Sequence, residues 1–291
     1  MEPFSLDFLD VGKKVRLHRL LYSYGPGNGR LMILPIDQGL EHGPVDFLDN
    51  LDAEHPHFQF ELAVKGGFSA IACHIGLAEK YYREYAGKIP LVLKINGRTN
   101  IPSNDLAFSP CDATVEDAVR LGADAVGYTL FVGSPRQDDD IAQLSMVREQ
   151  CRLAGMPLIV WAYPRGSAVD EKGGIDTLYA VDYAARTAQE LGADVIKINF
   201  PQPVNKFCPK GYQQTADWDL SKRVDKVVNS AGRSIVIFSG GSKIPEEELL
   251  NLLKTSVANG GSGAIFGRNL WQRPFDEAVA LAHKIRDILR Q

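Results

Sequence analysis

The chain has few cysteines, and none of them are spaced as a metal site or a redox motif would require. The four, Cys73, Cys111, Cys151 and Cys208, are widely scattered over the 291 residues, and no C-x-x-C pair occurs. Scattered thiols of this kind are typical of a protein in a reducing compartment, not of a disulfide framework or a zinc site. We therefore expect four free thiols.

Long apolar runs and an excess of positive charge are also absent. No run is long enough to span a bilayer, and acidic residues interrupt the apolar ones in the N-terminal segment, unlike in a signal peptide. The net charge is −4, and nucleic-acid binding would call for a basic patch. The sequence thus predicts a cytoplasmic protein that has neither a nucleic acid nor a membrane as a partner.

The chain also lacks an interdomain linker, and its composition is that of an ordinary globular protein, with 45% hydrophobic and 23% charged residues. From residue 30 onward, short apolar runs alternate with longer amphipathic ones. The eight strand candidates are residues 30–37, 68–75, 91–96, 124–131, 157–164, 194–201, 234–241 and 263–269.

Eight strand–helix units in a chain of this length predict an α/β fold, a closed (β/α)₈ TIM barrel. A doubly wound open sheet is the alternative, but no G-x-G-x-x-G follows the first strand. We predict a barrel domain over residues 30–291, preceded by a short helical extension over residues 1–29.

Two local patterns support repeated strand–helix units. "LGADAVGYTLF" begins at Leu121 and "LGADVIKINFP" at Leu191, a separation that two units of about 35 residues each would produce. Thr114 followed by Asp117 has the spacing of a capping box, and Pro245 begins an acidic segment that resembles the first turn of a helix.

Lys197 is the most unusual strand residue. Alternation along 194–201 places Ile196 and Ile198 on one face and Val195 and Lys197 on the other. A lysine turned toward a protein interior is costly unless its ammonium loses its charge, and a neutral lysine is an amine nucleophile. An ion pair with Asp37 or a contact with a phosphate are the alternatives for this residue.

Polar and aromatic side chains recur at the ends of the predicted strands. In a barrel these ends meet at one rim, where the active site lies. Their convergence predicts an active site in which Tyr163 or Asp37 transfers protons. The residues at these ends are Asp37, Lys94, Asn96, Trp161, Tyr163, Arg165 and Lys197.

The last two predicted strands end in glycine-rich segments, "SGGSK" (239–243) and "GRN" (267–269). Glycines let backbone N–H groups approach an anion, and Arg268 offers a planar fork of donors. Barrel enzymes commonly bind phosphate in the loops that follow strands seven and eight. With Lys197, these segments predict Schiff-base chemistry on a phosphorylated ketone.

Five motifs together resemble the archaeal-type (DhnA-like) class I fructose-bisphosphate aldolases: "ILPIDQGLEHGP", "VWAYPRG", "DVIKINF", "SGG" and "GRNLWQR". The resemblance implies a (β/α)₈ barrel that reversibly cleaves fructose 1,6-bisphosphate to dihydroxyacetone phosphate and glyceraldehyde 3-phosphate. It implies no metal or other cofactor, sugar phosphates as small-molecule partners, and a homo-oligomer such as a decamer.

Carried over by motif, Lys197 resembles the Schiff-base lysine, Tyr163 the proton donor and acceptor, and Asp37 the carboxylate that positions substrate hydroxyls and the lysine. Trp161 resembles a wall of the pocket. Arg165 and His42 are the candidates for the distal phosphate, and we add Lys94 to the substrate-binding residues. The segments around the C1 phosphate correspond to Ser239, Gly240, Gly241, Gly267 and Arg268.

The sequence departs from its relatives in two places. Asn199 stands where some relatives carry a second basic residue, and 201–217 is a long loop beside the predicted site that could reshape substrate access. A related ketose phosphate, with transaldol or acyl-transfer chemistry, stays open as the substrate. Two other hypotheses are a metal-dependent lyase that uses His55 and His57 and a non-catalytic sugar-phosphate sensor.

Overall fold

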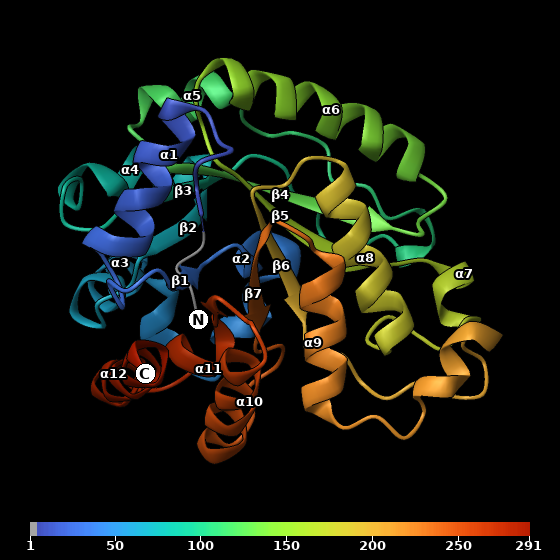
Figure 1. Cartoon of the computed structure of the whole chain (residues 1–291). Helices are drawn as coiled ribbons and strands as arrows, with labels where there is room; N and C mark the ends of the chain where they lie inside the picture. The colour runs from blue at the N-terminus through green and yellow to red at the C-terminus, as the bar shows by residue number, and fades with distance from the viewer. Residues whose placement is uncertain (1–4) are drawn as a thin grey trace.

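Eight parallel strands form a closed barrel in the computed structural model, which describes residues 5–291 (Figure 1). Each strand pairs with its neighbours in chain order, and β1 pairs with β8. The predicted barrel and all eight predicted strands are confirmed. The strands are β1 Leu31–Pro35, β2 Ala70–His74, β3 Leu91–Lys94, β4 Ala125–Val132, β5 Leu158–Pro164, β6 Val195–Asn199, β7 Ile235–Ser239 and β8 Gly263–Ile265.

Helices surround the barrel and cover its outer face (Figure 1). The helices of the described chain are α1 Val11–His18, α2 Gln38–Glu41, α3 Pro56–Lys65, α4 Ile75–Tyr81, α5 Val115–Arg120, α6 Gln137–Leu153, α7 Ser167–Asp170, α8 Leu178–Glu190, α9 Leu220–Ser230, α10 Glu246–Ala258, α11 Arg268–Trp271 and α12 Phe275–Arg290, of which the longer ones after β1 form the outer layer. Shorter 3₁₀ or π turns are η1 Arg19–Ser23, η2 Pro44–Phe47, η3 Leu51–Glu54, η4 Tyr82–Glu84, η5 Asn104–Leu106 and η6 Lys210–Thr215.

Strand alternation sorts the side chains into two apolar cores. Ile33, Val92 and Val195 belong to the core inside the barrel, whereas Ile196 and Ile198 belong to the core between the strands and the outer helices. All five are fully buried, and burial of each such side chain contributes about 1.5–3 kcal/mol. The predicted alternation of β6, with Lys197 on the inward face, is confirmed.

The N-terminal segment closes the end of the barrel at which the strands begin. Leu17, Leu20 and Leu21 are fully buried and belong to the same core as the inward-facing strand residues. The predicted extension therefore contributes α1 and η1 as a plug for the barrel. Its residues 1–4 lie outside the described part of the chain.

The repeated "LGAD" motif is the turn that connects a helix to the barrel strand that follows it. Gly122 and Gly192 follow α5 and α8 with φ angles of 69° and 93°, values that glycine adopts without strain. Asp124 and Asp194 come directly before β4 and β6. They form ion pairs with the N-terminal segment, at 2.8 Å from Arg19 and 2.7 Å from Lys13 respectively.

Several smaller predictions are also confirmed. Thr114 and Asp117 form a reciprocal capping box at the start of α5, and α10 begins directly after Pro245. All four thiols are free. Across residues 5–291, no helix combines the length and apolar character that crossing a membrane requires.

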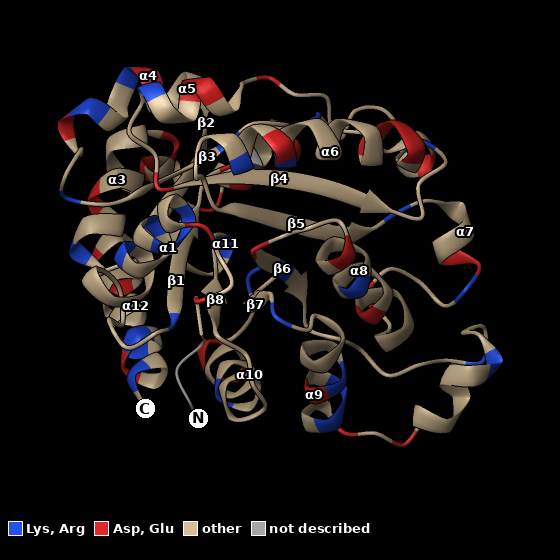
Figure 2. Cartoon of the chain, turned by 45° about the horizontal axis from the view of Figure 1, so that its top comes forward, with Lys and Arg blue, Asp and Glu red and all other residues tan. Residues whose placement is uncertain are grey.

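Charged residues lie on the helices and loops, with both signs interspersed (Figure 2). Within the eight strands, Lys94 on β3 and Lys197 on β6 are the sole residues of the types Lys, Arg, Asp and Glu. Both lysines are buried. A buried charge needs partners, so these two positions lead directly to the site.

Candidate active site

A cavity of about 480 Å³ opens at the C-terminal ends of the strands. The sequence predicts an active site at this rim, and most of the predicted site residues line the cavity. The lining residues are Pro35, Asp37, Glu41, His42, Val45, Asp46, Arg98, Thr99, Asn100, Asn104, Phe131, Tyr163, Arg165, Lys197, Asn199, Ser239, Gly240, Gly241, Ile265, Gly267 and Arg268.

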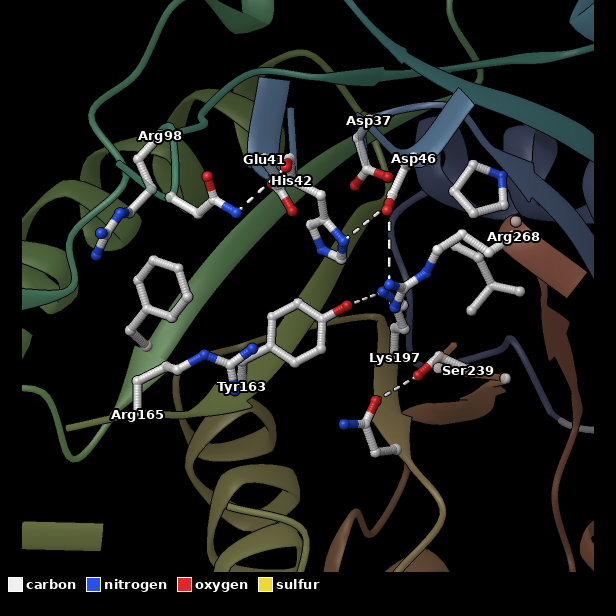
Figure 3. A pocket seen from close by; sticks show the side chains of 18 of the residues that line it. Asp37, Glu41, His42, Asp46, Arg98, Tyr163, Arg165, Lys197, Ser239 and Arg268 are labelled. Carbon is white, nitrogen blue, oxygen red and sulfur yellow. Dashed lines mark hydrogen bonds and ion pairs between the residues drawn. The ribbon is translucent and has the colours of Figure 1, made fainter. Parts of the chain in front are cut away.

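Lys197 lies at the centre of this arrangement. Its Nζ donates a hydrogen bond to the hydroxyl of Tyr163 (Figure 3). Burial lowers the pKa of Lys197 to about 8, although Asp37 and Glu41 act in the opposite direction. Near pH 7 a larger fraction of molecules therefore carries a neutral amine here than at an exposed lysine.

Tyr163 is held in its protonated form. Burial, together with the negative charges of Asp37 and Glu41, raises the pKa of its phenol well above the ordinary value. A phenol in contact with an amine nucleophile can give a proton to a nearby oxygen, and the phenolate left behind is a strong base. This geometry suits a proton carrier.

Lys94 lies beneath the cavity and does not line it. Its side chain has no exposed surface, and its Nζ donates to Glu41 Oε1 at 2.5 Å and to the carbonyl of Asn96 at 3.0 Å. Asp37 Oδ2 is 3.8 Å away. Two hydrogen bonds and a longer ion pair with Asp37 hold the ammonium beneath the cavity, so the geometry gives no direct substrate contact to the residue predicted to bind substrate.

Asp37 is the carboxylate shared by the two lysines. Burial alone opposes its ionisation, but the charges of Lys94 and Lys197 outweigh it and hold the pKa of Asp37 below its ordinary value. Asp37 lines the cavity and is ionised, so it can accept hydrogen bonds from substrate hydroxyls. Glu41, which the sequence reasoning passed over inside the motif "DQGLEHG", also lines the cavity beside it.

Trp161 supports the two lysines from below instead of forming the predicted wall. It is fully buried, and its ring centroid lies 5.5 Å from Lys94 Nζ and 5.6 Å from Lys197 Nζ. Gly127 makes room for it, because a Cβ there would lie 2.7 Å from the indole. The aromatic residues that line the cavity are Phe131 and Tyr163.

The five residues predicted around the first phosphate all line the cavity. Asn269, which no prediction singled out, joins the two segments. Its side chain accepts from the backbone N–H of Ile244 at 2.9 Å and donates to the carbonyls of Gly240 and Ser242 at 3.2 and 3.1 Å. The predicted phosphate loops are therefore fixed relative to one another.

The two residues predicted for the distal phosphate differ in their surroundings. Arg165 lies 5.1 Å from the ring of Tyr163 and lines the cavity. His42 Nδ1 lies 3.1 Å from Asp46 Oδ2, and the same carboxylate oxygen is 3.8 Å from Arg268 Nη1. His42 is thus linked through Asp46 to the arginine assigned to the other phosphate.

The cavity has basic residues at both ends. Figure 3 shows Arg98 and Arg165 on one side and Arg268 on the other, with Tyr163 and Lys197 between them. Arg98, like Asn269, was missed, because no strand pattern points to it. Its only sequence signal is its position in "NGRTN", just after the third predicted strand. Two cationic ends around one amine fit a ketose that carries two phosphates.

Asn199 and the 201–217 loop, where the sequence departs from its relatives, occupy different places relative to the cavity. Asn199 lines the cavity, donates to Asp176 Oδ1 at 2.7 Å and accepts from Ser239 Oγ at 2.5 Å. No residue of the 201–217 loop lines the cavity. This loop instead packs on α8, where the Tyr212 hydroxyl donates to Asp182 Oδ2 at 2.5 Å.

The histidines of "EHPHF" do not line the cavity. His57 Nδ1 lies 3.0 Å from the hydroxyl of Tyr85, and its ring packs edge-on against Tyr81. Within residues 5–291, no three His, Cys, Asp or Glu side chains are grouped as a metal ion would require. The metal-dependent hypothesis therefore lacks a ligand set in the described chain.

Known aldolases resemble this chain in sequence. The class 1 fructose-bisphosphate aldolase of Thermoproteus tenax is 38% identical over 262 residues, which cover 90% of each chain. That of Halobacterium salinarum is 35% identical over 246 residues, covering 84% of this chain and 86% of the relative.

Solved structures resemble it as well. An archaeal fructose-1,6-bisphosphate aldolase with its catalytic lysine covalently bound to the carbinolamine intermediate has a TM-score of 0.81 at 33% identity, covering 94% of this chain and all of that one. The aldolase of Slackia heliotrinireducens has a TM-score of 0.84 at 28% identity, covering 98% and 89%.

A family model for the DeoC/LacD family aldolases matches residues 31–273. The match begins at the first residue of β1 and continues past the end of β8, and it contains every residue that lines the cavity. The chain belongs to the DeoC/LacD family of aldolases.

Proposed function

We propose that this aldolase is a class I, metal-independent fructose-bisphosphate aldolase that acts through an imine on Lys197. The observation that carries the proposal is a buried lysine with a pKa of about 8, in contact with Tyr163 and flanked by two cationic ends of one cavity. The names of the relatives at 35–38% identity agree with it.

The steps follow from the positions of the side chains. The neutral amine of Lys197 adds to the C2 carbonyl, and the resulting hydroxyl leaves as water when Tyr163 gives it a proton, which forms the iminium. The Tyr163 phenolate then takes the C4 hydroxyl proton. The C3–C4 bond breaks, and its electrons move to the iminium as glyceraldehyde 3-phosphate leaves. Tyr163 returns the proton to C3 of the enamine, and water releases dihydroxyacetone phosphate.

Two assays test the proposal. Cleavage of fructose 1,6-bisphosphate should proceed in EDTA, and borohydride should trap dihydroxyacetone phosphate on the peptide that carries Lys197. Loss of cleavage in EDTA, or no adduct on any lysine, would refute the class I mechanism. Ligand binding without turnover would favour the sensor hypothesis, and a higher kcat/KM with another ketose phosphate would reassign the substrate.

The rate of trapping should depend on pH. Only the neutral amine attacks, so we expect the trapping rate to rise as Lys197 loses its proton and to level off above about pH 8. The measurement is the initial rate of borohydride-trapped adduct at several pH values, read by intact mass. A rate that keeps rising past pH 10 would show that Lys197 titrates as an ordinary lysine.

The assembly, location and division of the chain belong to the same proposal. The resemblance implies a homo-oligomer such as a decamer, and the exposed apolar residues Val11, Val15 and Leu153 offer a surface for such contacts, which light scattering would test. The four free thiols favour the cytoplasm. We retain residues 1–29 as an extension and residues 30–291 as the catalytic domain.

A further inference from the structure

We propose that Arg98 acts with Arg165 as a specificity-determining residue that binds the phosphate of the aldehyde half of the substrate. The proposal rests on the proposed function and adds a residue that neither the motifs nor the comparisons assign. Arg98 belongs to the segment that leads from β3 into η5; Thr99 and Asn100 of this segment and Asn104, the first residue of η5, also line the cavity.

The guanidinium of Arg98 is held in place but keeps donors free. Its Nε donates to the carbonyl of Thr99 at 3.1 Å, and its Nη2 donates to those of Pro102 and Ser103 at 2.6 and 3.0 Å. Arginine has five N–H donors, so the two on Nη1 are free for a ligand. These backbone contacts fix the fork before any ligand arrives, which lowers the entropy lost on binding.

Arg98 and Arg165 form a positive pair, and neither has an ion-pair partner in the described part of the chain. Burial lowers the pKa of Arg98, and the charge of Arg165 adds to this effect. Arg165 uses one donor on the carbonyl of Pro164, and neither arginine has a carboxylate within 4 Å among residues 5–291. Two guanidinium groups on one side of the cavity, with donors left free, offer charge-assisted hydrogen bonds to an anion.

The position of the pair identifies the anion. Tyr163 and Lys197 lie between these arginines and Arg268 (Figure 3), and Asn100 Nδ2 donates to the carbonyl of His42 at 3.2 Å, which ties the segment to the β1 side of the cavity. A substrate with one phosphate at Arg268 and its carbonyl at Lys197 would direct its other end toward Arg98. That end is the phosphorylated aldehyde.

The test compares two aldehydes in the synthetic direction. We would measure kcat/KM for the addition of dihydroxyacetone phosphate to glyceraldehyde 3-phosphate and to unphosphorylated glyceraldehyde. In Arg98→Gln the ratio of the two values should fall about tenfold to a hundredfold, because a charge-assisted contact to the phosphate is lost. Arg98→Lys should recover part of the ratio, since it retains the charge without the planar fork.

A structural role for Arg98 would give a different result. If Arg98 only holds its own segment, kcat/KM falls by the same factor for both aldehydes. The ratio then stays constant, and the proposal is overturned. Arg120→Gln is the matched control, because Arg120 is exposed, pairs with Glu79 and Asp117, and does not line the cavity. An equal fall of the ratio in this control would also overturn it.

Trapping separates this proposal from the function on which it rests. If the wild-type protein forms no borohydride adduct with dihydroxyacetone phosphate, the proposed function fails. If the adduct forms on Lys197 in both wild type and Arg98→Gln but the ratio does not change, the assignment of Arg98 alone fails.

Discussion

Lys197→Met should abolish the borohydride adduct and reduce cleavage of fructose 1,6-bisphosphate by about four orders of magnitude or more, as expected when a covalent nucleophile is removed. Methionine has a similar length but no amine. Asp37 keeps Lys94 as a cationic partner at 3.8 Å, so the substitution removes the nucleophile without leaving a buried carboxylate unpaired.

The fold should survive this substitution. Lys197 is buried, and its pKa of about 8 lies below the ordinary value of 10.5. The folded state therefore binds fewer protons than the unfolded state between about pH 8 and 10.5, so wild-type stability increases with pH across this window. Below pH 8 both states carry the proton, and the full cost of burying the ammonium applies.

Methionine removes this cost, so the free energy of unfolding of the variant should exceed that of the wild type by the largest amount below pH 8. Thermal unfolding at pH 7 and pH 9.5 would measure the difference, which should shrink at the higher pH. Lys206→Met is the matched control, because Lys206 is exposed and does not line the cavity. An adduct that persists in Lys197→Met would show that another lysine is the nucleophile.

The parts of the fold that the sequence predicted are those that local patterns encode. Alternation along 194–201 fixed the inward face of β6 because the side-chain period of a strand is two. The "LGAD" repeat could be recognised because the glycine that ends the helix and the aspartate that precedes the strand are close together in the chain. Because the strands of a closed barrel are parallel, their C-terminal ends all lie at one rim, which predicted where the site residues meet.

The parts that could not be predicted depend on contacts between distant segments. Lys94 ends a strand like a site residue, but its burial depends on Glu41, a residue from another strand–helix unit. Trp161 was expected in the wall and lies underneath, in space that Gly127 leaves on a neighbouring strand. Arg98 lies in a segment without periodicity, so only the folded chain shows that it lines the cavity.

Tyr163→Phe should uncouple imine formation from the breaking of the carbon–carbon bond. Phenylalanine keeps the ring on which the guanidinium of Arg165 lies at 5.1 Å, so the change removes only the hydroxyl. Water in the cavity can still protonate the departing C2 hydroxyl, and the adduct with dihydroxyacetone phosphate should form, though more slowly. Cleavage should fall by about 10²- to 10⁴-fold, the usual contribution of a positioned proton carrier.

Hydrogen exchange would locate the defect of Tyr163→Phe. In wild type the enamine is protonated at C3, so dihydroxyacetone phosphate should incorporate deuterium from D₂O, as read by NMR. The variant should lose this exchange while it keeps the trapped adduct. Normal turnover would contradict the assignment of Tyr163 as the proton carrier. Loss of the adduct together with the exchange would instead show that the hydroxyl serves to position the Lys197 amine, which it contacts directly.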